Sequence, residues 1–175
     1  QALRKERPKV IIHLGVLRNP LKHRGRSSAY AHNIANMSRL MQLGEVLKIR
    51  KFVFLSTANL YGPSATSAAF MNEDATLHGA DRSPEVRDLV TMDMLVQSLF
   101  WKAPETETVV LRPVHIIGGT LRNAPSRYLR LDPVPVLMGF DPQIQLVHAD
   151  DVVDAVRLSL APGVRGIFNI VGDGQ

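Results

Sequence analysis

The sequence predicts a single α/β domain built around a parallel β-sheet. Short, apolar, β-prone runs alternate along the chain with longer stretches whose apolar residues follow the helical period. Helices of that length between strands let every strand run in the same direction, so the sheet is expected to be covered on both faces. The 175 residues, 45% hydrophobic and 21% charged, suffice for one sizeable core and hardly for two.

Each predicted element has a local signal of its own. Strands are indicated by buried-type apolar runs at residues 10–14, 52–55, 108–111, 145–147 and 166–171. Helices with an apolar face are indicated at residues 28–47, 85–101 and 152–160, with a short one at 127–131. Ser83 and Pro84 are typical of a helix start, and Asp150 or Asp151 is expected to cap the last helix. Pro113 is expected to end its strand.

Two irregular segments interrupt the alternation of strands and helices. Residues 59–82 are rich in glycine, proline and small polar residues, which predicts a loop. Residues 121–146 are rich in proline and predict a small irregular lobe appended to the domain.

Composition limits the classes of protein to which the chain can belong. It has no cysteine, which excludes disulfides, thiolate metal sites and cysteine nucleophiles. It has neither an apolar run of the roughly 18 residues that span a bilayer nor an opening signal peptide, which fits a cytoplasmic protein. The formal charge of +5 gathers at residues 4–9 and 18–26. These clusters indicate either an anion-binding surface or a solvated loop, and the lack of interleaved aromatic residues before Tyr30 argues against nucleic acid.

Six short motifs follow one another in an order that resembles a known family. They are V-I-I-H-L-G-V at residues 10–16, Asn33, F-V-F-L-S-T-A-N-L-Y-G at 52–62, L-R-P at 111–113, V-H-A-D-D-V at 147–152 and the tail at 166–172. The series resembles the extended short-chain dehydrogenase/reductases, the NAD-dependent epimerase/dehydratases, and the second half is similar to UDP-glucose 4-epimerase-like proteins. The resemblance implies the C-terminal portion of a Rossmann-type doubly wound sheet, NAD or NADP as cofactor, and a nucleotide or nucleotide sugar as ligand.

The glycine-rich turn with which this family begins is missing. In the family a G-x-x-G-x-x-G turn holds the pyrophosphate at a helix N-terminus. Gly15, Gly25, Gly44 and Gly62 have no partners at that spacing. Either the chain is a fragment of a longer protein or the phosphate cradle has been lost. A sheet that opened at Val10 would have an unpaired edge and exposed apolar faces, which favours the fragment.

The catalytic Tyr-x-x-x-Lys pair of the family is missing as well. In the family the tyrosine exchanges a proton with the substrate oxygen, and the lysine lowers its pKa. None of the three tyrosines here is followed four residues later by a lysine. Laying Y-x-R-D-K-x-x-x-E over residues 85–93 keeps the Arg-Asp dipeptide and an acidic end, but places Glu85 at the tyrosine and Leu89 at the lysine. If the motif is shifted by two residues, Arg87 falls at the tyrosine position and Thr91 at the lysine position.

The resemblance assigns roles to residues at the strand ends. It implies cofactor contacts from Leu14, Gly15, Val16, Asn33, Ser56, Arg112, Pro113 and Val114, and a substrate contact from His115. Thr57 matches the Ser/Thr that fixes the substrate oxygen, or it simply satisfies backbone groups at a strand end. Arg112 faces the nicotinamide end or forms a surface ion pair. Gly15 permits close approach of a ligand or a turn, and Asn33 ties a cofactor loop or bonds a helix neighbour.

Two further hypotheses concern acid/base and metal chemistry. Glu85 is either a replacement general base or a carboxylate that stabilises a helix N-terminus, and the helix dipole favours its ionised form. His13, His115 and His148 all fall at predicted strand ends. They share neither an i, i+4 spacing nor a motif carboxylate, so no metal site is expected.

Two functions from different classes remain open. One is a NAD(P)-using epimerase, dehydratase or reductase with unusual acid/base residues. The other is a degenerate, non-enzymatic member that binds a dinucleotide, or nothing, and serves in regulation or assembly. The missing Tyr/Lys pair favours the second, while the strand-end motifs favour a nucleotide-type pocket in both. The helix at 85–101 lies where the family pairs helices in a homodimer, although covering the sheet would need the same apolar face.

Overall fold

A four-stranded parallel sheet forms the centre of the molecule. The computed structural model describes residues 8–16, 26–62, 70–82, 86–136, 138–139 and 144–173. Within them the strands lie in the order β1-β2-β3-β6 and all pair in parallel. They span Val10–His13, Lys51–Leu55, Glu107–Pro113 and Gly166–Ile170. The parallel α/β sheet predicted from the alternation is therefore confirmed.

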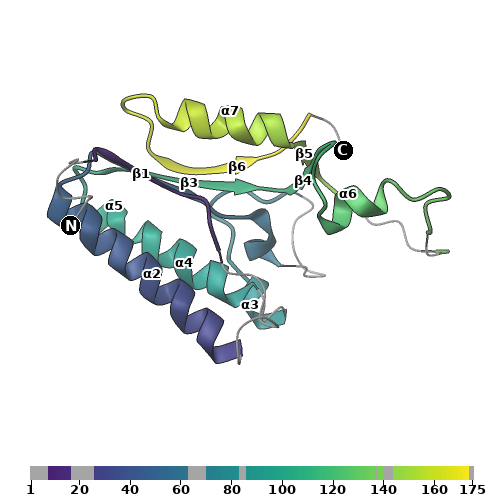
Figure 1. The fold of residues 1–175 in the computed structure, drawn as a ribbon, viewed down its shortest axis with the longest axis horizontal. Coiled ribbons are helices and arrows are strands. Elements are labelled where there is room, and N and C mark those ends of the chain that lie inside the picture. The colour runs from purple at the N-terminus through teal and green to yellow at the C-terminus, as the bar shows by residue number, and fades with distance from the viewer. Residues whose placement is uncertain are drawn as a thin grey trace.

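Helices cover both faces of this sheet, as the alternating pattern predicted (Figure 1). On one face lie α2 (Arg26–Leu47), α4 (Arg87–Gln97) and α5 (Leu99–Lys102). On the other lies α7 (Ala149–Ser159), beside β6. Two short elements, the 3₁₀ turn η1 (Ala58–Tyr61) and the helix α3 (Gly79–Arg82), fall inside the segment that was expected to be only a loop.

Beyond the end of the main sheet lies a smaller unit built from three short elements. Strands β4 (His115–Ile117) and β5 (Leu146–His148) pair in parallel as a separate two-stranded sheet. The helix α6 (Ala124–Tyr128) packs beside β4 and projects from the main body (Figure 1). Asn123 caps α6, because its side-chain oxygen accepts a hydrogen bond from the Ser126 backbone N–H at 3.0 Å.

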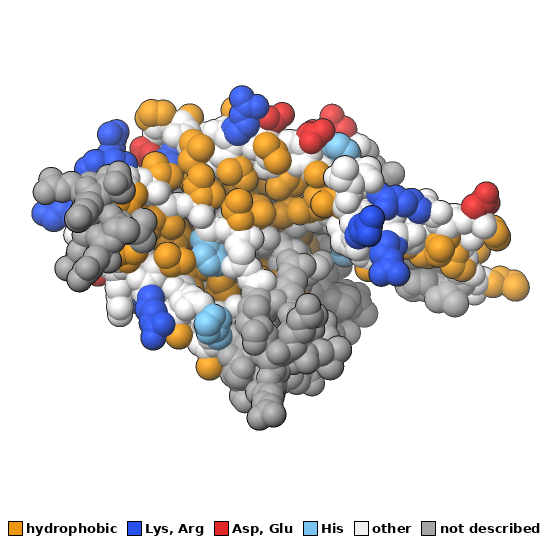
Figure 2. All heavy atoms as spheres, in the orientation of Figure 1, with side chains coloured by type: hydrophobic (Ala, Val, Ile, Leu, Met, Phe, Trp, Pro, Cys, Tyr) orange, Lys and Arg blue, Asp and Glu red, His pale blue; other side chains and the backbone are white. Residues whose placement is uncertain are grey.

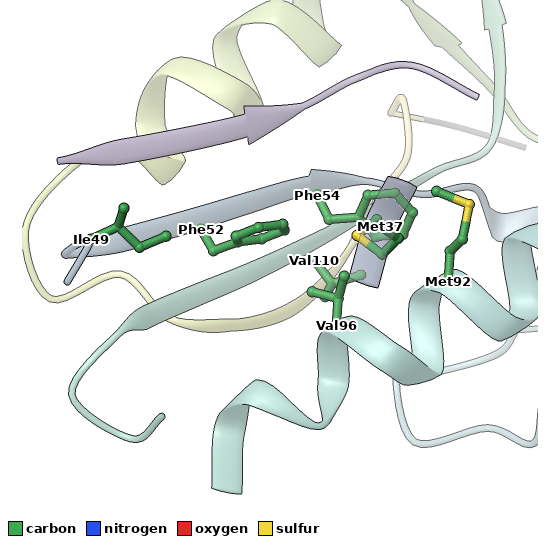
Figure 3. Packing of buried hydrophobic residues seen from close by; sticks show 7 residues of the cluster. All are labelled: Met37, Ile49, Phe52, Phe54, Met92, Val96 and Val110. Atoms are coloured by element: carbon green, nitrogen blue, oxygen red, sulfur yellow. The ribbon is translucent and has the colours of Figure 1, made fainter. Parts of the chain in front are cut away.

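The alternation of side chains along β2 divides the core into two layers. Phe52 and Phe54 point toward α2 and α4, where they pack with buried methionine and valine side chains (Figure 3). Val53 points the opposite way and packs with Val109, Leu111 and the inner face of α7. A strand that is buried on both faces shows a continuous apolar run in place of an apolar–polar alternation, which explains the sequence pattern of β2.

Three sequence expectations need correction in detail. The helix expected over residues 85–101 is divided at Ser98, whose hydroxyl donates to the Leu95 carbonyl oxygen at 2.7 Å. The cap of α7 is His148 and not Asp150 or Asp151, because the His148 Nδ1 accepts from the Asp150 N–H. The strand β4, which begins two residues after Pro113, was not anticipated at all, because three residues with no alternation carry too little signal.

The strand β1 forms one edge of the four-stranded sheet and leaves apolar side chains exposed. Val10 and Ile12 are each 41% exposed and Leu14 is 58% exposed, all on the side of the sheet opposite α2. Figure 2 shows hydrophobic side chains spread across the face of the molecule on which β1 lies. The exposed apolar edge expected for a sheet that opens at Val10 is therefore present among the described residues.

Candidate active site

The carboxyl ends of the parallel strands meet beside a cavity of about 750 Å³. In open parallel sheets this edge is the usual place for a ligand. Its wall comes from η1, the segment after residue 69, the β3–β4 junction and the end of β6. The lining residues are Ala58, Asn59, Tyr61, Gly62, Phe70, Met71, Glu73, Val86, Val114, His115, Gln145, Asn169 and Val171. The volume lies within the range of small-molecule pockets.

Two of the residues singled out from the sequence, Val114 and His115, line this cavity. They follow β3, and the Val114 N–H is held by the carbonyl oxygen of Ile170 at 3.0 Å. Thr57 lies next to the cavity wall as the N-cap of η1, where its hydroxyl accepts from the Asn59 N–H at 3.3 Å. Thr57 thus satisfies a local backbone group, and its contact with a substrate oxygen stays a prediction. Among the described residues its hydroxyl proton has no acceptor, so it can still donate to a ligand.

Ser56 and Arg112 do not line the cavity but form a buried polar network beneath it. The Arg112 guanidinium binds the Asp93 carboxylate through two hydrogen bonds, Nη2 to Oδ1 at 2.8 Å and Nε to Oδ2 at 3.2 Å. The Ser56 hydroxyl donates to the same Oδ2 at 2.6 Å. Arg112 is 1% exposed and Asp93 0%. Arg112 therefore forms an ion pair, as one interpretation of the sequence suggested. The pair is buried and not on the surface, because α4 places the Asp93 carboxylate directly under β3.

The network continues from Arg112 to the cavity wall. The Arg112 Nη1 donates to the Tyr61 hydroxyl oxygen at 2.9 Å and to the Glu73 carbonyl oxygen at 3.0 Å. The Tyr61 hydroxyl in turn donates to the Asn169 Oδ1 at 2.7 Å. The Asn169 N–H donates to the Glu73 Oε1 at 2.8 Å. Segments that are distant in sequence are thereby tied together at one corner of the cavity.

The charge state of Arg112 follows from these partners. Burial by itself would lower the pKa of Arg112, but the hydrogen bond and charge of Asp93, together with Tyr61, raise it above the usual value. The guanidinium is therefore permanently charged and neutralised by Asp93. It acts as a rigid support for Tyr61 and Glu73 and cannot exchange a proton.

The position of Asp93 is compatible with one of the two registers in which the family motif can be laid over α4. Asp93 is the acidic end of the motif laid over residues 85–93, and it is the residue that the buried arginine holds. In that register the lysine position is Leu89, which is 6% exposed and packs in an apolar cluster with Leu60 and Val90. Glu85, at the tyrosine position, and the helix start at Ser83 and Pro84 lie outside the described residues.

The residues at the end of β1 lie open to their surroundings. Leu14 and Gly15 are exposed and Val16 is half-buried. A Cβ added at Gly15 would meet no described atom within 4 Å, so the space beside this backbone is free for a ligand. Asn33 is buried on α2, and its Nδ2 donates to the Asp88 Oδ2 of α4 at 2.9 Å. Asn33 therefore bonds a neighbouring helix, and its role toward a cofactor stays a prediction.

A glycine shapes the cavity wall where η1 ends. Gly62 has a φ of 70°, and a Cβ added there would lie 2.8 Å from the Gly79 backbone nitrogen. Only glycine fits this conformation and this close approach. Gly62 thus brings α3 against η1, and the chain after residue 69 can return beside the cavity.

Four residues of the site were not given a role from sequence. Tyr61 and Asn169 belong to the Y-G and tail motifs, whose positions alone gave no function. Glu73 lies in a segment without pattern, and Asp93 was only the acidic end of a motif. A charged residue at an apolar position of a helix was the one available signal, and it marks Asp93.

Two classes of feature are absent from the described part of the chain. It contains no group of three or more His, Cys, Asp or Glu side chains arranged to hold a metal ion. None of its helices combines the length and the apolarity needed to cross a bilayer.

The fold and the site together define a Rossmann-type α/β protein with its ligand cavity at the carboxyl edge of the sheet. The family model of the NAD dependent epimerase/dehydratase family matches residues 1–171. The chain therefore belongs to the NAD-dependent epimerase/dehydratase family, as the motif series predicted.

The chain is similar to curated proteins at low identity. The chain is 29% identical over 126 residues to an uncharacterized protein of Mycobacterium tuberculosis, and equally to one of Mycobacterium bovis. The match covers 72% of this chain and 34% of the relatives. The chain thus spans about a third of the length of these relatives.

Solved structures confirm the fold. A NAD-dependent NDP-hexosamine 5,6-dehydratase of tunicamycin biosynthesis superposes with a TM-score of 0.79 at 18% identity, over 99% of this chain and 57% of that one. The dTDP-glucose 4,6-dehydratase of Bacillus anthracis, in complex with NAD, gives 0.77 at 18% identity, over 99% and 54%. The UDP-N-acetylglucosamine 4-epimerase of Methanobrevibacter ruminantium gives 0.76 at 17% identity, over 98% and 58%.

Proposed function

We propose that this chain supplies the ligand cavity of a NAD(P)-binding, nucleotide-sugar-type family member whose redox chemistry is impaired or atypical. The observation that carries the proposal is that α4 lacks the motif lysine in either register, including the one in which Asp93 is the acidic end. Asp93 is held by Arg112 and Ser56, and in that register an apolar leucine occupies the lysine position. Without a cation one helical turn from the acid/base group, proton exchange with a substrate oxygen loses its usual activation.

Three features of the strand ends support a dinucleotide as the cofactor. The backbone at Gly15 has open space beside it, Val114 is apolar and faces the cavity, and the Thr57 hydroxyl retains a proton to donate. When bound, NAD or NADP supplies hydride transfer, and the residues of this chain supply orientation and exclusion of water. The Ser56 hydroxyl is committed to Asp93, so we assign it to the support of the site and not to direct contact.

The cavity beyond these strand ends suits a hydroxyl-rich ligand. Its lining combines apolar surface from Val114, Phe70 and Met71 with the amides of Asn59 and Gln145. Amide groups both donate and accept hydrogen bonds, as sugar hydroxyls do. Among the solved relatives, dTDP-glucose 4,6-dehydratase and UDP-N-acetylglucosamine 4-epimerase carry nucleotide-sugar names, and this supports a nucleotide sugar as the ligand class.

The second candidate function is a non-enzymatic dinucleotide-binding module that serves in regulation or assembly. The apolar side chain of Leu89 favours this second function as well. The surfaces at the strand ends resemble those of the family, while a leucine stands where the motif would have its catalytic lysine. On that hypothesis the exposed Met94 and Trp101 on α4 and α5, 60% and 73% exposed, would form part of a contact surface such as the homodimer implied by the resemblance.

Cofactor binding and turnover separate these functions. The full-length protein is titrated with NAD, NADH, NADP and NADPH, and its melting temperature is followed. A ligand at a hundred times its dissociation constant stabilises the folded state by about 2.7 kcal/mol, which corresponds to a rise of several degrees. Trp101 is 73% exposed and does not line the cavity, so melting temperature is a better measurement than its fluorescence.

The possible results point in different directions. A shift with one cofactor pair, followed by turnover of a sugar nucleotide, would establish the enzyme. A shift without turnover of the sugar nucleotides offered supports the binding module. The absence of a shift with all four compounds would contradict both cofactor-based functions.

A further inference from the structure

The charge of the cavity lining indicates which sugars the site accepts. Among the described lining residues, the only one with a full charge at neutral pH is Glu73. No lysine or arginine is among these described lining residues. Arg112 lies beneath the wall, but its charge is matched by Asp93. The described part of the lining therefore presents a net negative charge.

Glu73 is fixed at the wall of this cavity. Its Oε1 accepts the Asn169 N–H at 2.8 Å, and its carbonyl oxygen accepts the Arg112 Nη1 at 3.0 Å. Asn169 is itself held by the Tyr61 hydroxyl and by the Met71 carbonyl oxygen, to which its Nδ2 donates at 3.1 Å. Within the described part of the chain the Glu73 carboxylate forms no ion pair, so no neighbouring cation cancels its charge.

We propose that Glu73 is a specificity-determining residue that makes the cavity select uncharged over carboxylated sugars. This proposal rests on the nucleotide-sugar function proposed above and deepens it. Neutral sugar hydroxyls can donate to the carboxylate and bond the amides of Asn59 and Gln145. A sugar carboxylate would meet a like charge with no compensating cation among the described lining residues, and at this partial burial the repulsion weakens binding about tenfold.

The test uses two sugar nucleotides that differ in this one group. Dissociation constants of UDP-glucose and UDP-glucuronic acid are measured by calorimetry with the full-length protein at pH 8, where ordinary imidazoles are neutral. We expect UDP-glucose to bind about ten times more tightly, and the ratio to shrink as salt screens the repulsion. This salt dependence requires no variant and therefore does not depend on how well any variant folds.

Glu73→Gln removes the charge and keeps the Oε1 that accepts the Asn169 N–H. This variant should bring the ratio of the two dissociation constants close to one. Asp74→Asn is the matched control, because Asp74 is the exposed neighbouring carboxylate and does not line the cavity. It should leave the ratio unchanged.

Failure of this inference can be told from failure of the proposed function. Equal binding of the two nucleotides, tighter binding of UDP-glucuronic acid, or an unchanged ratio in Glu73→Gln overturns the role of Glu73 and leaves nucleotide-sugar binding intact. Binding of neither nucleotide, in the presence of whichever cofactor shifts the melting temperature, overturns both.

Discussion

At the scale of single residues, the chemistry is set by which polar groups are buried and which partners they find. His13 ends β1, and its ring packs against Phe54 with a centroid distance of 5.6 Å. Its Nδ1 is buried without a hydrogen-bond partner among the described residues. Burial disfavours the imidazolium and lowers the pKa of His13, although a backbone hydrogen bond partly opposes this. The neutral ring is therefore the form that the folded state accommodates.

A pH dependence of stability follows from His13. Its pKa is lowered in the folded state, so the unfolded state binds the proton more tightly. The stability contribution of the neutral ring is complete above the unfolded pKa of about 6.5 and is lost as the pH falls toward the folded pKa. Melting temperatures at pH 8 and pH 5.5 should differ more for the wild type than for His13→Gln. Equal differences would show that this ring does not control the acid sensitivity.

At the scale of secondary-structure elements, Lys51 of β2 binds the C-terminal end of α7 to the sheet. Its Nζ donates to the carbonyl oxygen of Ser159 at 2.8 Å and to that of Ala161 at 2.5 Å, and lies 3.0 Å from the Glu107 Oε2. A cation at a helix C-terminus satisfies carbonyl groups that have no partner within the helix. Hydrogen bonds from the Gly163 N–H and from Lys51 lower the pKa of Glu107, so this ion pair persists well below neutral pH.

Replacement of Lys51 by methionine should loosen α7. Lys51→Met keeps the apolar stem but leaves buried carbonyl groups without a donor, which costs about 2 kcal/mol of unfolding free energy. Lys102→Met is the matched control, because Lys102 is exposed at the end of α5 and should change stability by less than about 0.5 kcal/mol. Urea unfolding monitored by far-UV circular dichroism measures both. Similar losses in the two variants would contradict the role of Lys51.

At the scale of the whole molecule, the Arg112–Asp93 pair connects segments that have no local relation. Asp93 belongs to α4 and Arg112 to β3, and the pair also binds Ser56 and Tyr61. These contacts hold the cavity wall in one arrangement. Because both groups are nearly inaccessible to water, each depends on the other for the neutralisation of its charge.

A double-mutant cycle should reveal this dependence. Asp93→Leu or Arg112→Met alone leaves one buried charge unpaired and should cost about 3–5 kcal/mol of unfolding free energy. The double variant should lose clearly less than the sum. The exposed pair Arg157 and Asp154, 3.4 Å apart on α7, is the control and should give a coupling close to zero. Additive losses at Arg112 and Asp93 would show that the pair does not act as a unit.

The sequence by itself determined the main strands and helices and their order, but not the short elements η1, α3 and β4. Apolar runs gave the strands, the helical period gave α2, α4 and α7, and the ordered motifs gave the Rossmann-type family, since each of these signals is local. Val114 and His115 could be placed at the cavity from the L-R-P motif that they follow. The absence of the Tyr-x-x-x-Lys pair was also evident from spacing alone.

Tertiary structure decided which side chains meet. Only the packing of α4 under β3 showed that Asp93 neutralises Arg112, that Leu89 lies in an apolar cluster, and that Glu73 stands at the cavity wall. These contacts join residues that lie many positions apart, and burial of a charge is favourable only where the fold supplies a partner. The sequence pattern around a buried charge does not identify the partner that neutralises it. The charge of the site could therefore be determined from the fold and not from the motifs.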